Sequence, residues 1–152
     1  MDERENGLIP VMGFAQTALS PQALERCNAL SERFGLRLTP TQARELDRAR
    51  LRALEDTGRV ELDGGVLPKL IYAFCDSPFL EADAYAETLE ALQALFYAFK
   101  AETRDALSDD EVIEGMAAAF HGPAQGSLEY LEGMSAAELY RFSLGKGESD
   151  EA

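Results

Sequence analysis

The chain has 152 residues, a length that matches one domain with a single hydrophobic core. Hydrophobic residues make up 46% of it and charged residues 28%, the balance of a soluble globular protein rather than of a disordered or membrane-spanning one. Asp and Glu number 28 against 14 Lys and Arg, which gives a net charge of −14 and disfavours nucleic acid as a partner, because affinity for phosphate backbones comes mainly from Lys and Arg.

The negative charge is concentrated in the second half of the chain. Residues 20–62 carry eight basic and seven acidic side chains, a net charge of +1, whereas residues 76–152 carry four basic and seventeen acidic ones, a net charge of −13. We therefore expect two differently charged surfaces. The acidic surface either keeps the protein soluble or forms a docking face for a basic partner.

Targeting and redox signals favour a cytoplasmic protein. The short apolar stretch in residues 1–17 is broken by Pro10 and Gly13, which is not the pattern of a signal peptide. No apolar run approaches the roughly 18 residues that span a bilayer, so no membrane association is expected. Cys27 and Cys75 lie 48 positions apart, so we predict neither a disulfide framework nor a cysteine-based metal site.

Two helices are predicted before residue 59. Ser20 followed by proline is typical of an N-cap, and the helix that it begins ends at Gly35. Thr39, again followed by proline, begins a second helix that ends at Gly58. The apolar residues expected to face the core are Leu24, Cys27, Leu30 and Phe34 in the first helix and Ala43, Leu46, Ala53 and Leu54 in the second.

Arg50 falls on the apolar stripe of the second helix. We interpret it as a side chain whose stem covers apolar surface while its guanidinium reaches water. The alternative is a buried arginine that binds an anion.

The segment RVELDGGVL, residues 59–67, is typical of strand and turn. Val60 and Leu62 alternate with charged residues, and the Asp-Gly-Gly that follows favours a tight turn. We therefore predict one small β-hairpin near residues 59–67. Pro68 suits the first turn of a helix, so residues 68–76 are predicted to form a short, buried helix that is apolar almost all round.

The strongest helical pattern is YAETLEALQALFYAFKAET, residues 85–103. Apolar residues recur in it at intervals of three and four, so we predict that this helix is the centre of the domain. Its inward positions are Tyr85, Leu89, Leu92, Phe96, Phe99 and Thr103.

Three more helices are predicted after the central one. A Ser-x-x-Glu capping box at Ser108 begins a helix that ends at Gly122. A short helix follows Ser127. A second capping box, at Ser135, begins a last helix that ends near Leu144.

Together these elements predict a mainly α fold, a single-domain helical bundle of about five to seven helices. The domain spans residues 18–144, after an N-terminal segment over residues 1–17. Residues 145–152 have nothing apolar to bury and are expected to form a disordered acidic tail.

Three stretches of the chain resemble a family of uncharacterised bacterial proteins. They are GRVELDGGVLPKLIYAFCDSPF, YAETLEALQALFYAFK and SDDEVIEGMAAAFHGPAQGSLEYLEGM, and the first is unusual enough to be specific. The similarity runs from about residue 18 to residue 142. The domain that these proteins share has no assigned function, so the resemblance implies no activity, cofactor or site residue.

Cys75 is the first candidate for chemistry. It lies near the end of a predicted helix, beside Asp76 and among apolar side chains, and each of these surroundings opposes the thiolate. We therefore interpret Cys75 as a buried structural residue rather than a nucleophile.

Four polar residues are candidates for a ligand site: Arg50, Asp76, His121 and Gln125. His121 is the chain's one histidine and lacks companions at metal-ligand spacing, so no metal site is predicted. Gln125 lies in the loop HGPAQGSLEY, which presents polar groups to a ligand at a helix N-terminus or, alternatively, is a tight turn between helices.

These residues assign no biochemical function, and we predict no catalytic residue and no cofactor. The first hypothesis is a soluble, cytoplasmic, non-catalytic helical module that binds another protein through an acidic or apolar face. The alternative is a small-ligand binder or an enzyme with a site around Asp76, His121 and Gln125. A third hypothesis, a nucleic-acid mimic, depends on net charge alone, and the oligomeric state is not predicted.

Overall fold

The computed structural model describes residues 20–59, 66–104 and 106–148. Within these ranges the chain forms seven α-helices, two short 3₁₀ helices and no strand, which confirms the predicted mainly α bundle of five to seven helices. The elements are α2 (Pro21–Ser31), η1 (Glu32–Phe34), α3 (Pro40–Thr57), α4 (Leu67–Phe74), η2 (Ala82–Ala84), α5 (Tyr85–Thr103), α6 (Asp109–His121), α7 (Leu128–Glu132) and α8 (Ala136–Glu148).

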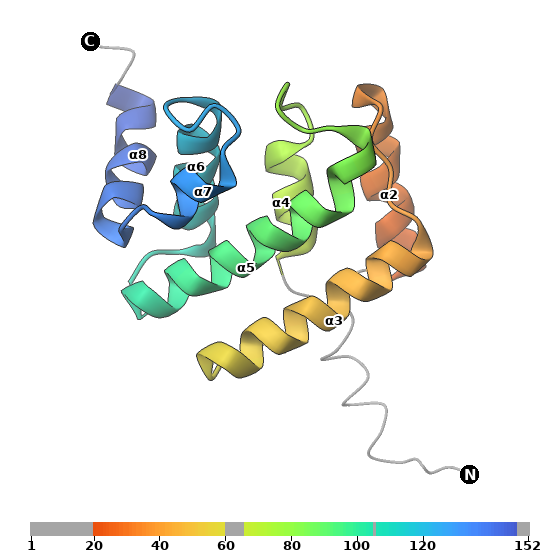
Figure 1. Ribbon diagram of the computed structural model, residues 1–152, viewed down its shortest axis with the longest axis horizontal. Helices are drawn as coiled ribbons and strands as arrows, with labels where there is room; N and C mark the ends of the chain where they lie inside the picture. Colours follow the sequence, from red (N-terminus) through yellow and green to blue (C-terminus); the bar gives the residue numbers. More distant parts are fainter. Residues whose placement is uncertain (1–19, 60–65, 105, 149–152) are drawn as a thin grey trace.

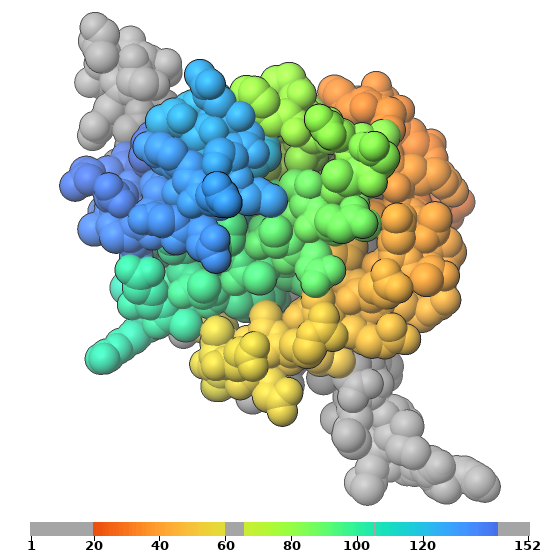
Figure 2. Space-filling view, in the orientation of Figure 1, coloured from red at the N-terminus to blue at the C-terminus, as the bar shows by residue number. Residues whose placement is uncertain are grey.

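The helices form two layers. Figure 1 shows α3 and α5 running side by side across one face, with α2, α4, α6 and α8 behind them. In Figure 2 the orange and yellow helices of the first part of the chain and the blue helices of its last part lie on opposite sides of the green α5. Within the described ranges, no helix combines the length and the apolar character that crossing a membrane requires.

Helix α5 is the centre of the core, as predicted. It contacts α3, α4, α6, α7 and α8. Five of its six predicted inward residues are buried, and Thr103 is half-buried. Gln93, Tyr97 and Lys100 are buried as well, because α5 has neighbours on more than one side and a single apolar stripe underestimates the buried surface.

The predicted caps set the helix boundaries. The Thr39 hydroxyl accepts a hydrogen bond from the Gln42 backbone N–H at 3.1 Å, and the Gln42 side chain accepts from the Thr39 N–H at 2.9 Å. Ser108 forms the same kind of capping box with Glu111. Gly58, at φ 67°, ends α3 in the left-handed conformation that glycine adopts without strain.

The predicted β-hairpin near residues 59–67 finds no support. Residues 60–65 lie outside the described residues, α3 ends at Thr57 before them, and α4 begins at Leu67 after them. Arg59 follows the glycine that ends α3, and Leu67 is already the first residue of α4. Helix α4 begins one residue before its predicted start because proline is tolerated throughout the first turn.

Helix α8 is longer than predicted. It continues to Glu148, four residues past the expected end near Leu144, so residues 145–148 of the predicted tail are helical. A glycine inside a helix costs only about 1 kcal/mol relative to alanine, and the two glycines of this stretch therefore do not end the helix. Residues 149–152 lie outside the described residues.

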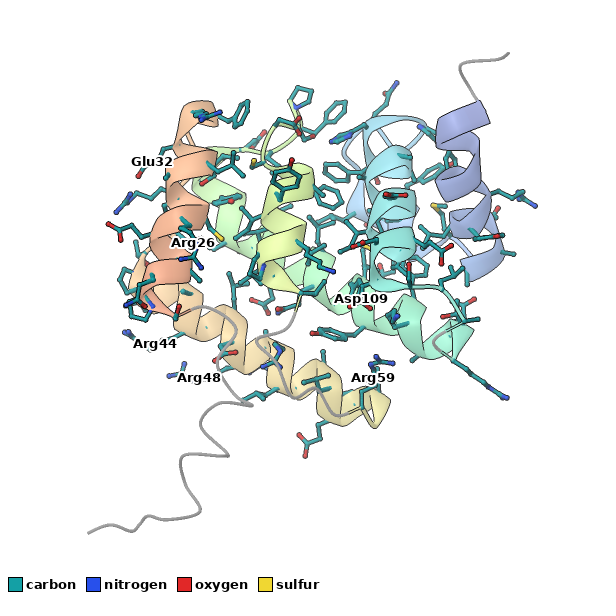
Figure 3. The ribbon with its side chains drawn as sticks, turned by 180° about the vertical axis from the view of Figure 1, so that it is seen from behind. Arg26, Glu32, Arg44, Arg48, Arg59 and Asp109 are labelled. Carbon is teal, nitrogen blue, oxygen red and sulfur yellow. The ribbon has the colours of Figure 1, made fainter. Side chains whose placement is uncertain are left out.

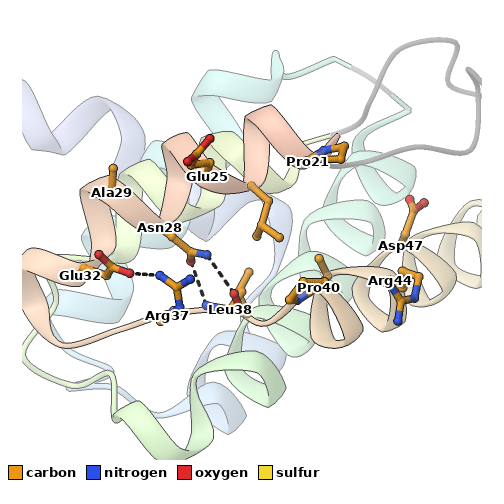
Figure 4. Close-up of a pocket in the computed structure, with 12 residues that line it drawn as sticks. Pro21, Glu25, Asn28, Ala29, Glu32, Arg37, Leu38, Pro40, Arg44 and Asp47 are labelled. Carbon is orange, nitrogen blue, oxygen red and sulfur yellow. Dashed lines mark hydrogen bonds and ion pairs between the residues drawn. The ribbon is translucent and has the colours of Figure 1, made fainter.

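The buried face of α2 differs from the predicted one. Leu24, Cys27 and Leu30 are half-buried and Phe34 is 48% exposed, whereas two polar residues, Asn28 and Ser31, are buried. The polar pair binds the backbone that follows the helix. As Figure 4 shows, the Asn28 amide donates to the Leu38 carbonyl and accepts from the Leu38 N–H, both at 2.9 Å. The Ser31 hydroxyl donates to the Leu36 carbonyl at 2.8 Å.

Candidate functional site

Helices α4 and α6 run parallel, with their two C-terminal ends together. Near their N-terminal ends, Lys69 Nζ donates to Asp110 Oδ1 at 3.2 Å. Near their C-terminal ends, the ring centroids of Phe74 and His121 lie 6.1 Å apart. Figure 3, a view from behind, shows α4 and α6 side by side with α5 beyond them.

A groove of about 680 Å³ lies between these two helices. Its floor consists of buried or half-buried apolar side chains, and its rim of exposed polar and aromatic ones. We call it the α4–α6 groove. The floor residues are Pro68, Ala73, Ile113, Ala117 and Ala118, and the rim residues are Lys69, Tyr72, Asp76, Asp110, Glu114 and His121.

Helical spacing explains why these side chains converge. Positions 69, 72 and 73 share one face of α4, position 76 follows in the turn after that helix, and positions 110, 113, 114, 117, 118 and 121 share one face of α6. Three of the floor residues are alanines, which leave space between two helices that large side chains would otherwise fill. The groove is therefore a product of residue size and spacing on two helices that the core holds in place.

The rim of the groove is acidic. It carries the carboxylates of Asp76, Asp110 and Glu114 against the single ammonium of Lys69, with His121 beside them. Lys69 is paired with Asp110, and among the described residues neither Asp76 nor Glu114 has an ion-pair partner. A cation in the groove would therefore meet two carboxylates that no described residue neutralises.

Tyr72 is the most exposed of the large apolar or aromatic side chains that the structure describes, at 75%. On the opposite face of α4, Leu67, Leu70 and Phe74 are each 0% exposed. Tyr72 therefore lines the groove from a helix whose opposite face is anchored in the core, four residues before Asp76.

The groove brings together two of the four predicted ligand residues, Asp76 and His121. Gln125 does not line it. It lies exposed in the loop after α6, with a positive φ of 49°. Arg50 does not line it either.

The interpretation of Arg50 as a side chain that reaches water is wrong. The residue is 0% exposed, because α5 packs against this part of α3, and its guanidinium lies 3.5 Å from the Asp47 carboxylate. Whether Arg50 binds an anion stays a prediction.

Cys75 is 2% exposed and part of the core, which confirms its predicted burial. Burial raises the pKa of its thiol, and the neighbouring Asp76 carboxylate raises this pKa further. Both effects reduce the thiolate, the reactive form, at neutral pH.

Sequence reasoning missed Lys69, Tyr72, Asp110 and Glu114 as members of the site. On a single helix, each of them is an ordinary exposed residue. The available signal was their spacing, which puts Lys69 and Tyr72 on one face of α4 and puts Asp110 and Glu114 on the face of α6 that carries His121.

A second hollow, of about 780 Å³, lies between α2 and α3 and is drawn in Figure 4. Acidic and basic side chains alternate around it, and two of them, Glu32 and Arg37, form an ion pair across its edge. Its polar Asn28 is already bonded to Leu38. This hollow contains none of the predicted ligand residues, and its mixed charges favour no particular partner.

The described residues contain no group of three or more His, Cys, Asp or Glu side chains that would hold a metal ion. The chemistry that the α4–α6 groove does offer is recognition of a partially apolar ligand with positive charge, through its apolar floor and its two unpaired carboxylates.

A protein-family model described as a family of unknown function, DUF6323, matches residues 23–145. This match agrees with the resemblance to proteins of unassigned function that the three sequence stretches indicate. Neither the curated proteins nor the solved structures include a match to this chain.

Proposed function

Because the chain belongs to the DUF6323 family, which has no assigned function, we propose its role from the α4–α6 groove: it is a non-catalytic protein-interaction module that docks a segment of another protein there. The setting that we propose is the cytoplasm, as the composition and the two free cysteines favour.

The exposed ring of Tyr72 is the observation that carries this proposal. Tyrosine is enriched in protein interfaces because it supplies a large, rigid contact area with a polar end. A folded monomer gains little from holding such a ring 75% exposed beside a hollow of alanines. Docking of a partner segment would bury both the ring and the apolar floor.

The dimensions of the groove also support a protein segment as the ligand. Its lining residues on α6 run from Asp110 to His121, which at about 1.5 Å per residue is a length of roughly 16 Å. A helix of about three turns has this length, and amphipathic helices commonly dock in such grooves.

A small-ligand site is the second candidate, because Asp76 and His121 line the same groove. A volume of about 680 Å³ is also in the range of small-molecule pockets. In this candidate the carboxylate and the imidazole would orient a ligand on the apolar floor.

Site-directed photo-crosslinking in the cell of origin tests the first candidate. A photoreactive phenylalanine analogue at position 72 should form a covalent adduct with one other protein. The same analogue at Tyr130, which is 45% exposed on α7 and outside the groove, is the matched control. An adduct that is absent at position 72, or equally abundant at both positions, would contradict the proposal.

A thermal-shift screen with metabolites and nucleotides tests the second candidate. A ligand that binds only the folded state raises the melting temperature, by an amount that grows with its concentration. The shift should disappear in Asp76→Asn and His121→Ala. If a ligand gives such a shift and no adduct forms at position 72, the second candidate is supported and the first is contradicted.

A further inference from the structure

We propose that the occupant of the α4–α6 groove is a basic amphipathic helix that binds antiparallel to α4 and α6. This inference rests on the proposed docking function and names the partner's chemistry and its direction. The groove's charges, its Tyr72–Asp76 pair and the parallel arrangement of its two walls carry the argument.

The first step is the charge of the rim. Asp76 and Glu114 face the groove without an ion-pair partner among the described residues, and the carboxylate of Asp110 is already paired with Lys69. A partner with lysines or arginines beside its apolar face would neutralise both free carboxylates. An acidic partner would add like charges at short range, which disfavours binding.

The second step is the pair formed by Tyr72 and Asp76. Tyr72 lies on α4, Asp76 lies four residues later in the turn that follows the helix, and both residues line the groove. An arginine side chain suits this pair, because its planar guanidinium stacks on an aromatic ring and forms two hydrogen bonds with a carboxylate. We assign Tyr72 and Asp76 as the arginine subsite of the groove.

The third step is direction. The C-terminal ends of α4 and α6 lie together at the end of the groove that holds Asp76, and helix C-termini carry a partial negative charge. At the opposite end, Asp109 and Asp110 are each paired with a lysine, at 2.8 Å and 3.2 Å respectively. The positive N-terminal end of a docked helix is therefore most favourable near Asp76, which makes that helix antiparallel to both walls.

The fourth step is the apolar contact. Ala73, Ala117 and Ala118 leave room for larger side chains from the partner. Leucines at positions i, i+3, i+4 and i+7 of the docked helix would fill this floor and leave the flanking positions for arginine.

A pair of designed peptides tests the inference. The basic probe is a capped 14-residue helical peptide with leucines at i, i+3, i+4 and i+7 and arginines on both flanks, and the acidic probe has glutamate at every arginine position. We expect the basic probe to bind and the acidic probe not to bind. Raising NaCl from 50 to 300 mM should weaken binding of the basic probe, because salt screens exposed charges.

Two variants and a matched control locate the site. Asp76→Lys and Tyr72→Ala should each weaken binding of the basic probe about tenfold or more, the size of effect that losing roughly 1.4 kcal/mol produces. Glu55→Lys makes the same charge change on an exposed residue of α3, outside the groove, and should weaken it less than about threefold. Equal loss in Asp76→Lys and Glu55→Lys would overturn the inference, since binding would then follow net charge alone.

Photo-crosslinking measures the direction of the bound probe. A photoreactive residue at Lys69 should label the C-terminal third of the basic probe, and one at His121 should label its N-terminal third. The reverse order, or no preference, would overturn the antiparallel assignment.

The two proposals fail separately. Suppose that position 72 forms a cellular adduct but the basic probe does not bind. This result would refute the basic helix as the occupant and would still support the docking function. Suppose instead that the probe binds specifically in the groove but no cellular adduct forms. This result would refute the docking function and would still support the preference of the groove for a basic ligand.

Discussion

Several polar groups of this protein are buried inside helix interfaces, and each has a local effect that can be measured. Tyr85, the first residue of α5, is 1% exposed, and its hydroxyl has no hydrogen-bond partner among the described residues. Burial raises the pKa of Tyr85 to about 12, and the Ser31 hydroxyl acts in the opposite direction by lowering this pKa. An unpartnered phenol in a core disfavours its anion strongly.

This pKa predicts a loss of stability at high pH. An unfolded tyrosine titrates near pH 10, so between about pH 10 and 12 the folded state retains a proton that the unfolded state has released. The stabilisation is fully present below pH 10 and is lost as the pH rises to 12, about 2–3 kcal/mol in all. Urea unfolding at pH 9, 10.5 and 11.5 measures this loss of stability.

Tyr85→Phe is the control for this prediction. The variant should lose less stability than the wild type over the same pH range, because its ring has no proton to release. At pH 7 it should be as stable as the wild type within about 1 kcal/mol, since the missing hydroxyl made no hydrogen bond. Identical pH profiles for the two proteins would contradict the raised pKa of Tyr85.

At the residue scale, the sequence predicted burial correctly where the adjacent residues alone decide whether a side chain is buried. The burial of Cys75 followed from its apolar neighbours. The prediction failed where a charged side chain is buried beneath a neighbouring helix or loop. Arg50 pairs with Asp47 beneath α5, and Lys100 reaches Asp109 and the Leu107 carbonyl, at 2.8 Å and 2.7 Å respectively.

At the scale of elements, α6 packs directly against α8. Gly115 on α6 makes it possible, because a Cβ at this position would lie 2.6 Å from the Leu139 carbonyl oxygen and 2.9 Å from Leu139 Cγ. Leu139 is 0% exposed and belongs to α8. The glycine therefore sets the distance between the two helices.

Gly115→Ala is predicted to destabilise the protein. In an exposed helix, alanine would be more stable than glycine by about 1 kcal/mol, but here the backbone of α8 must move. We expect a net loss of about 1–3 kcal/mol, the usual effect of overpacking. The measurement is the midpoint of urea unfolding.

Gly133→Ala is the matched control for Gly115→Ala. A Cβ at Gly133 would be no closer than 3.6 Å to its nearest neighbour, and the residue has a negative φ of −83°. This variant should change the free energy of unfolding by less than about 0.5 kcal/mol. Equal effects of the two substitutions would show that the contact with Leu139 is not the cause.

The helices themselves were the most predictable part of the fold, because caps and apolar periodicity are local. Ser20, Thr39, Ser108 and Ser127 each cap the helix that they were predicted to begin. Relations between helices were not predictable. The groove exists because α4 and α6 are parallel neighbours, and no local pattern encodes which helices meet or in which direction.

At the scale of the whole molecule, charge is divided between two sides. The helices after residue 76 carry most of the net negative charge, and the last of them, drawn in blue, lie on the opposite side of α5 from α2 and α3 in Figure 2. Figure 3 shows Arg26, Arg44 and Arg48 on the side of α2 and α3, away from α6. The fold thus keeps apart the two charge regions that the sequence contains.

This division predicts that salt stabilises the protein. At 10 mM salt the Debye length is about 30 Å, so the acidic helices repel one another, whereas above 100 mM it falls to about 10 Å or less. Salt also weakens favourable exposed pairs such as Lys69–Asp110, but each is worth only about 0–1 kcal/mol. Lys100 and Asp109 are largely shielded from this effect because the lysine is buried.

Repulsion should therefore dominate, and the melting temperature should rise by a few degrees between 10 and 300 mM NaCl at pH 7. The double variant Glu129→Gln with Glu132→Gln removes two exposed charges of α7 without touching the groove. It should melt higher than the wild type at 10 mM NaCl and gain less from added salt. A wild-type melting temperature that falls as salt is added would mean that favourable charge pairs outweigh the repulsion in the acidic half.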